Sequence, residues 1–157
     1  MSTKIEDLIR TFQITFDQNP WYGKSIMDVL KQVDYRKINN KPGGSPHSIA
    51  QLLKHMIAWR TFAIIRLDQD PGFLIEMNSE EDWSSLMIQS EKEWEELIQE
   101  LKESQEKILE ILKTKEEESL NQLMPESKYT FMNLVEGVIQ HDVYHLGQIA
   151  MLNKMLS

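Results

Sequence analysis

Apolar side chains recur every three or four residues along four long stretches of the chain. This period is typical of amphipathic helices and not of strands. Turn-forming residues, including all five prolines, separate the stretches at 19–23, 39–46, 68–73 and 124–127. The pattern therefore predicts long helices over about 3–17, 48–67, 83–113 and 130–156, with a short helix at about 24–31.

The start of the second stretch carries a helix-capping signal. Ser48 is followed three residues later by Gln51, and side chains at this spacing can each satisfy a free backbone N–H group. We expect the helix to begin there.

In the third stretch, nine positions spaced three or four residues apart lie along one face of the predicted helix, and glutamate and lysine are frequent on its other faces. Seven of the nine positions are apolar, which predicts a solvated helix with one buried seam. These positions are Trp83, Met87, Ser90, Trp94, Leu97, Leu101, Ser104, Ile108 and Ile111.

No segment reads as a convincing strand, so the expected fold is all-α. Four amphipathic helices of this length most simply pack as a four-helix bundle, here with short connecting helices. A chain of 157 residues has the size of one domain, and we expect residues 1–157 to form a single one. The connections 39–46 and 70–80 are long enough to hold irregular structure.

Composition narrows the class of protein. With 41% apolar and 27% charged residues the chain is globular, and the lack of an apolar run near 18 residues argues against a membrane span. The acidic N-terminal segment lacks the apolar run of a secretory signal. The chain contains no cysteine, which excludes disulfides, zinc–thiolate sites and cysteine nucleophiles and fits a cytoplasmic protein. A net charge of −8 without a basic run argues against nucleic-acid binding.

Two histidines interrupt the apolar stripe of the last predicted helix. His141 and His145 are four residues apart, which on a helix is about 40° of rotation and about 6 Å of rise, so both imidazoles can reach one ion. His55 occupies a stripe position of the second long helix. Three core-directed imidazoles could hold a divalent ion and leave positions for water or substrate.

A histidine in an apolar stripe is more often a hydrogen-bonded core residue than a metal ligand. The metal interpretation also requires that the helices bring His55 opposite the pair. Burying three neutral imidazoles without partners would cost a few kcal/mol, so some partner is required, and a shared ion is the simplest one.

Four further residues are candidates for the surroundings of this site. His47 lies eight residues before His55, about 12 Å along a helix, which is too far for the same ion. We expect it at the mouth of the bundle, facing substrate. Trp59, one turn after His55, is expected near a pocket, and Tyr144 and Gln148 are candidates for contacts with the ligating histidines or the substrate.

The segment HDVYH resembles the H-E-x-x-H motif of zinc proteases, with Asp142 in place of glutamate. We do not favour a protease, because aspartate is one methylene shorter and no third ligand follows downstream. Asp142 is expected either to orient an imidazole or to face solvent. Gly137, one turn before His141, is expected to leave space for a ligand. No serine lies in a strand–turn–helix elbow, so Ser/His/Asp catalysis has no support.

Three segments, NPWYGKSIMDVLKQVDYRKI, GGSPHSIAQLLKHMIAWR and QHDVYHLGQIAMLNK, resemble the DinB/YfiT-like superfamily of bacterial metal-binding four-helix bundles. The resemblance runs in order over nearly the whole chain. It is most specific at the histidine of LLKHM and at the H-x-x-x-H followed by Leu-Gly-Gln. It implies that His55, His141 and His145 bind a divalent ion, commonly zinc or nickel, with open coordination sites, and that the protein is a homodimer.

Characterised members of this superfamily include S-transferases that use bacillithiol or mycothiol and an isomerase that uses a small thiol. The leading hypothesis is therefore a metal-dependent transferase, in which the ion activates a low-molecular-weight thiol that attacks an electrophile. Because the chain has no cysteine, the sulfur would come from a small-molecule cosubstrate. The alternatives are a metal-dependent hydrolase with bound water as nucleophile, and a non-catalytic, stress-related bundle that binds a metal or ligand. No residue is assigned as general base.

Overall fold

The computed structural model describes residues 2–68, 70 and 72–157. These residues form six α-helices and two short 3-10 helices, and they contain no β-strand, only one isolated bridge between Leu123 and Thr130. The elements are α1 (Lys4–Asp17), α2 (Ile26–Leu30), η1 (Tyr35–Lys37), η2 (Pro42–Gly44), α3 (Ile49–Asp68), α4 (Glu91–Thr114), α5 (Glu117–Leu120) and α6 (Phe131–Leu156). The predicted all-α bundle is confirmed.

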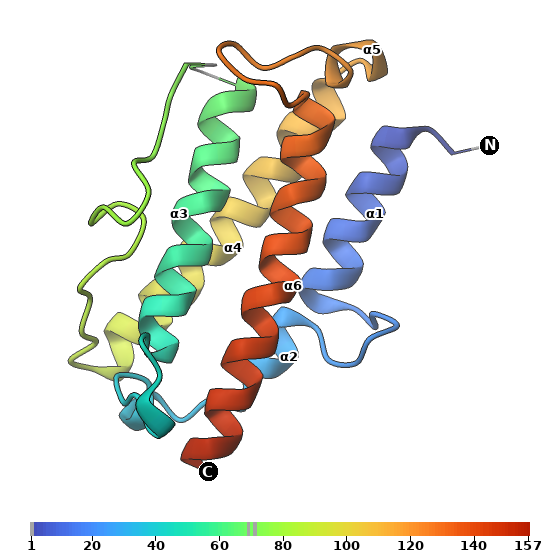
Figure 1. The fold of residues 1–157 in the computed structure, drawn as a ribbon. Helices are drawn as coiled ribbons and strands as arrows, with labels where there is room; N and C mark the ends of the chain where they lie inside the picture. The colour runs from blue at the N-terminus through green and yellow to red at the C-terminus, as the bar shows by residue number, and fades with distance from the viewer. Residues whose placement is uncertain (1, 69, 71) are drawn as a thin grey trace.

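The four long helices α1, α3, α4 and α6 pack side by side (Figure 1). Following the chain, α3 and α4 start at the same end of the bundle, whereas α1 and α6 run in the opposite direction (Figure 1). The connection between α3 and α4 therefore returns along the outside of the bundle beside α3. No helix in the described part of the chain is both long and apolar enough to cross a membrane.

Side-chain caps fix the starts of the helices as the sequence indicated. The Ser48 hydroxyl accepts from the Gln51 backbone N–H at 3.3 Å, and the Gln51 side chain accepts from the Ser48 N–H at 3.1 Å, so α3 begins at Ile49 as predicted. Complete capping boxes at Thr3 and Thr130 start α1 and α6. The short predicted helix is present as α2.

The predicted start of the third long helix is wrong. Residues 83–90 are not helical, and α4 begins at Glu91 with Ser90 as its cap. The direction of α4 gives the reason. Because α4 runs parallel to α3, the chain must first return over the length of α3, and an extended segment covers about 3.3 Å per residue where a helix covers 1.5 Å.

A buried polar layer divides the core into two apolar clusters. On α3, α4 and α6 alike, one cluster ends before this layer and the other begins after it. The layer consists of Arg60, Ser104, Gln105 and Asp142. The Arg60 guanidinium donates to both oxygens of Asp142, with a shortest contact of 2.8 Å, and both side chains are only 1% exposed.

All four long helices meet at Arg60, with Asp142 contributed by α6. Arg60 on α3 also donates to Ser104 and Gln105 on α4, and its guanidinium lies over the rings of Phe12 and Phe16 on α1. From the sequence, Asp142 is expected to orient an imidazole or to face solvent. Both expectations are wrong, because Asp142 is buried and its hydrogen-bond partner is Arg60.

Candidate metal centre

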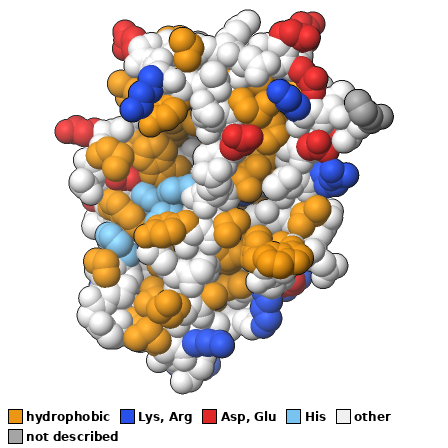
Figure 2. Space-filling view, turned by 45° about the vertical axis from the view of Figure 1, so that its right-hand side comes forward, with side chains coloured by type: hydrophobic (Ala, Val, Ile, Leu, Met, Phe, Trp, Pro, Cys, Tyr) orange, Lys and Arg blue, Asp and Glu red, His pale blue; other side chains and the backbone are white. Residues whose placement is uncertain are grey.

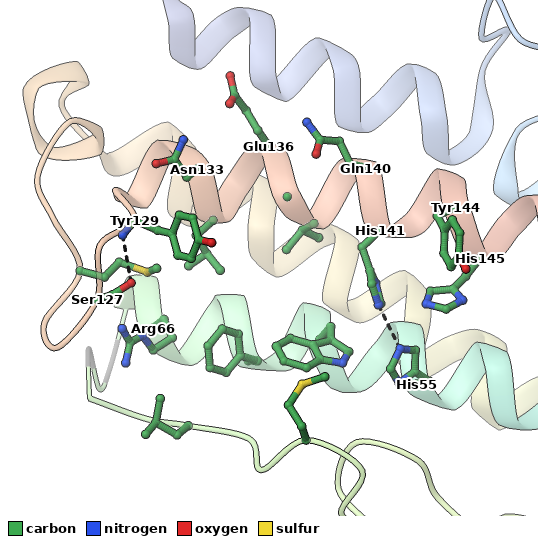
Figure 3. A pocket seen from close by; sticks show the side chains of 18 of the residues that line it. His55, Arg66, Ser127, Tyr129, Asn133, Glu136, Gln140, His141, Tyr144 and His145 are labelled. Carbon is green, nitrogen blue, oxygen red and sulfur yellow. Dashed lines mark hydrogen bonds between the residues drawn. The ribbon is translucent and has the colours of Figure 1, made fainter.

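Three imidazoles converge where α3 faces α6 (Figure 3). His55 comes from α3, and His141 and His145 come from successive turns of α6, where residues four apart lie on the same face. The Nε2 atoms of His55 and His141 are 3.0 Å apart, and the three side chains offer one nitrogen each within 4.8 Å of one another. The group could hold a metal ion, so the structure meets the condition that the metal interpretation required.

The three imidazoles are held in the neutral form that metal ions require. Burial lowers the pKa of His55 and His145, and burial together with the neighbouring His145 lowers the pKa of His141 to about 3. Near neutral pH each ring therefore carries one hydrogen and one lone pair.

Hydrogen bonds at Nδ1 determine which nitrogen keeps the lone pair. The Nδ1 atom of His55 lies 2.7 Å from the backbone oxygen of Asp82, and a carbonyl oxygen can only accept. Nδ1 therefore donates, and the lone pair lies on Nε2, facing His141. In the same way Nδ1 of His145 donates to the Gln148 side chain at 2.6 Å. Such outer contacts are the usual means of orienting metal-binding histidines.

The connection between α3 and α4 supplies the support for His55. The Asp82 carboxylate lies 3.1 Å from Nδ1 of His55 and accepts from the indole N–H of Trp59 and the backbone N–H of Asn78. The indole of Trp83 stacks on the His55 ring with centroids 3.7 Å apart. The role of this segment is not predicted from the sequence, because the apolar spacing places Trp83 in the seam of a helix.

An open pocket of about 840 Å³ extends from the histidines along α3 and α6. Its walls are mainly apolar, and Figure 2 shows the histidines in a hollow bordered by hydrophobic side chains. Gly137 lines the pocket, and nothing lies within 4 Å of the place where its Cβ would be. The space expected beside His141 is therefore present.

The four surrounding candidates occupy different places. Trp59 and Tyr144 line the pocket, and Gln148 contacts His145 without lining it. His47 does not line the pocket. Its ring stacks on Trp83 with centroids 3.5 Å apart, which places it behind the residue that packs against His55.

Comparison with known proteins supports the resemblance noted from the three segments. A search of curated proteins and a search of solved structures gave no match. The family model described as the DinB family matches residues 1–156, which is essentially the whole chain. On this match, together with the helical bundle and its three-histidine group, the chain belongs to the DinB family.

Proposed function

We propose that the protein is a metal-dependent transferase that joins a low-molecular-weight thiol to an electrophile. The ion would be held by His55, His141 and His145. The observation that carries this proposal is the convergence of three imidazoles at one end of an open, mainly apolar pocket. A metal with a purely structural role is normally enclosed by four protein ligands, whereas catalytic sites keep a position open.

The donor set fits zinc or nickel, since imidazole nitrogens suit both ions. A divalent ion with open positions lowers the pKa of a thiol or of water that reaches it, and so makes a nucleophile available near neutral pH. The chain has no thiol of its own. In the proposed reaction the cosubstrate sulfur forms a bond to the electrophilic carbon, the bond to the leaving group breaks, and the thiol proton leaves with that group.

The residues of the chain would bind, orient and shield the reactants. Asp82 and Trp83 hold His55, and Gln148 holds His145. Trp59 and Tyr144 lie on the pocket wall next to the histidines and are proposed to contact the substrate. The apolar walls would exclude water from the place where the sulfur–carbon bond forms.

The test is conjugation of chlorodinitrobenzene with mercaptoethanol. The rate above the uncatalysed background is expected to require both the metal-loaded protein and the thiol. Release of dinitrophenol without thiol would overturn the proposal and favour the hydrolase, because water would then be the nucleophile. Full metal loading with no rate above background for a panel of thiols and electrophiles would favour the non-catalytic bundle. The homodimer, the cytoplasmic location and the lack of nucleic-acid binding remain predictions.

The role of Asp82 leads to a prediction about metal affinity. Asp82→Asn removes the negative charge beside Nδ1 of His55 and keeps the size of the side chain, so metal binding is expected to weaken about 10- to 100-fold. Competition with a chromophoric chelator measures the change. Glu81→Gln is the matched control, because it removes the same charge from the exposed neighbouring residue. Equal affinities in both variants would contradict the role assigned to Asp82.

A further inference from the structure

A second polar feature of the pocket is a buried arginine that pairs with no carboxylate of the described residues. Arg66 on α3 is only 3% exposed and lines the pocket. Among the described residues, no aspartate or glutamate oxygen lies within 4.0 Å of its guanidinium. Arginine stays charged at any physiological pH, and a buried charge is normally paired. The contrast with Arg60, which is paired with Asp142, is direct.

The bonds that Arg66 does make fix its position and do not neutralise its charge. Its two terminal nitrogens donate to the backbone oxygens of Phe73 and Pro125, at 3.1 and 3.2 Å. These bonds use two of the five N–H groups of the guanidinium. The Nε atom is buried and has no hydrogen-bond partner among the residues that the structure describes. The Arg66 guanidinium is therefore held in place in the pocket wall and keeps N–H groups that can donate to a ligand.

Arg66 and the histidines lie at opposite ends of one pocket (Figure 3). His55 and Arg66 are eleven residues apart on α3, which is about 16 Å along the helix. Figure 3 shows Ser127 and Tyr129 close to the arginine end. Both hydroxyl groups can donate hydrogen bonds. The apolar lining residues of the pocket include Phe62, Leu74, Met77, Leu134 and Val138. Figure 3 shows the polar lining residues Asn133, Glu136 and Gln140 along α6 between the two ends.

We propose that Arg66 forms a carboxylate subsite of this pocket. Its ligand is an elongated molecule that places a carboxylate at Arg66, an apolar middle part along the wall, and its reacting end near the histidines. Guanidinium and carboxylate match in charge and in planar, two-bond geometry. The assignment of the reacting end rests on the proposed function, whereas the carboxylate subsite itself does not. The carboxylate belongs to the thiol or to its acceptor.

The subsite is tested on metal-free protein, so that its outcome is independent of metal binding and of catalysis. Decanoate and decanol share an apolar chain and differ in charge at one end. Binding is followed by the fluorescence of Trp59 and Trp83, which line the pocket. Decanoate is expected to bind about tenfold or more tightly than decanol, as a charge-assisted hydrogen-bond pair implies, and Arg66→Gln is expected to abolish this preference.

Two further variants keep the test decisive. Arg10→Gln removes the same charge from an exposed position on α1 and is expected to keep the preference. Arg66→Lys keeps the charge but loses the forked geometry, so the preference is expected to fall several-fold. Circular dichroism shows whether each variant is folded. Equal binding of decanoate and decanol by the wild-type protein, or an unchanged preference in either folded Arg66 variant, would overturn the subsite.

Metal-loaded protein then separates the two sources of the carboxylate. If the thiol carries it, mercaptoundecanoic acid binds more tightly than mercaptoundecanol, and Arg66→Gln removes the difference. If the acceptor carries it, Arg66→Gln raises the KM of a carboxylated electrophile and leaves that of its neutral analogue unchanged, with mercaptoethanol as thiol. A dependence on Arg66 in either arm supports the subsite, and independence in both would overturn it.

Discussion

Protein in which alanine replaces His145 is expected to lose nearly all of its divalent metal, whereas the wild-type chain is expected to carry about one ion. The reason is geometric. The remaining imidazoles, His55 and His141, provide only two ligands, and protein sites for zinc use at least three. Elemental analysis of protein purified without chelator measures the ratio, and dialysis against zinc or nickel tests whether affinity or supply limits it.

His47→Ala is the matched control for this experiment. It makes the same substitution at a histidine that stacks on Trp83 and lies outside the three-histidine group, so metal content is expected to stay near that of the wild type. Unchanged metal in the His145 variant, or equal loss in both variants, would place the ion elsewhere. Circular dichroism distinguishes loss of the site from loss of the fold, since His145 is buried.

Arg60→Met is expected to lower the free energy of unfolding by about 3–5 kcal/mol, the usual cost of removing one partner of a buried ion pair. The variant leaves the Asp142 carboxyl in the core without its guanidinium. Burial raises the pKa of this carboxyl, and Arg60 opposes the rise, so the group in the variant must either lose solvation as an anion or take up a proton. Urea unfolding of metal-free protein gives the change.

The double variant Arg60→Met with Asp142→Leu tests whether the cost comes from the unpaired carboxyl. Replacing both partners by apolar groups leaves no charge to desolvate, so most of the lost stability is expected to return. A double variant as unstable as Arg60→Met would show that packing around Arg60, and not the charge left on Asp142, carries the effect. A loss below about 1 kcal/mol in the single variant would contradict the prediction outright.

The histidine group could be predicted from sequence because its signal is local. His141 and His145 fall on one stripe of one helix, and His55 falls on the stripe of another, so periodicity alone selected all three. The starts of α1, α3 and α6 were predictable for the same reason, because the residues that cap a helix lie within one turn of its first residue.

The start of α4 was missed although it also had a local signal. Ser90 caps the helix and is followed three residues later by Glu93, whereas the apolar spacing of Trp83 and Met87 imitates one more helical turn. Neither residue belongs to a helix seam, since Trp83 stacks on His55 and Met87 is exposed. Period counting cannot separate a helix seam from a loop residue that packs against a different helix.

The polar partners were not predictable, because their meaning depends on tertiary contacts. Asp82 ends the acidic run 80–82, which resembles a solvated loop. Only the path of the chain between α3 and α4 brings it to His55 and Trp59. In the sequence alone, Arg60 resembles a solvent-exposed residue on the outer face of a helix. In the structure, α4 and α6 surround it with hydrogen-bond acceptors. The burial of such a charged residue depends on partners distant in sequence, so a local sequence pattern does not predict it.

The polar layer has a consequence for alignment of the helices. Apolar contacts are tolerant, so α6 could slide against α3 by one turn, about 5.4 Å, and still bury comparable surface. The Arg60–Asp142 ion pair forms in only one register of α6 against α3, and a shift by one turn would leave both charges buried without a partner. Asp142 directly follows His141 and precedes His145 by three residues. The ion pair that fixes the register of α6 against α3 therefore also fixes the position along α3 at which the α6 imidazoles meet His55.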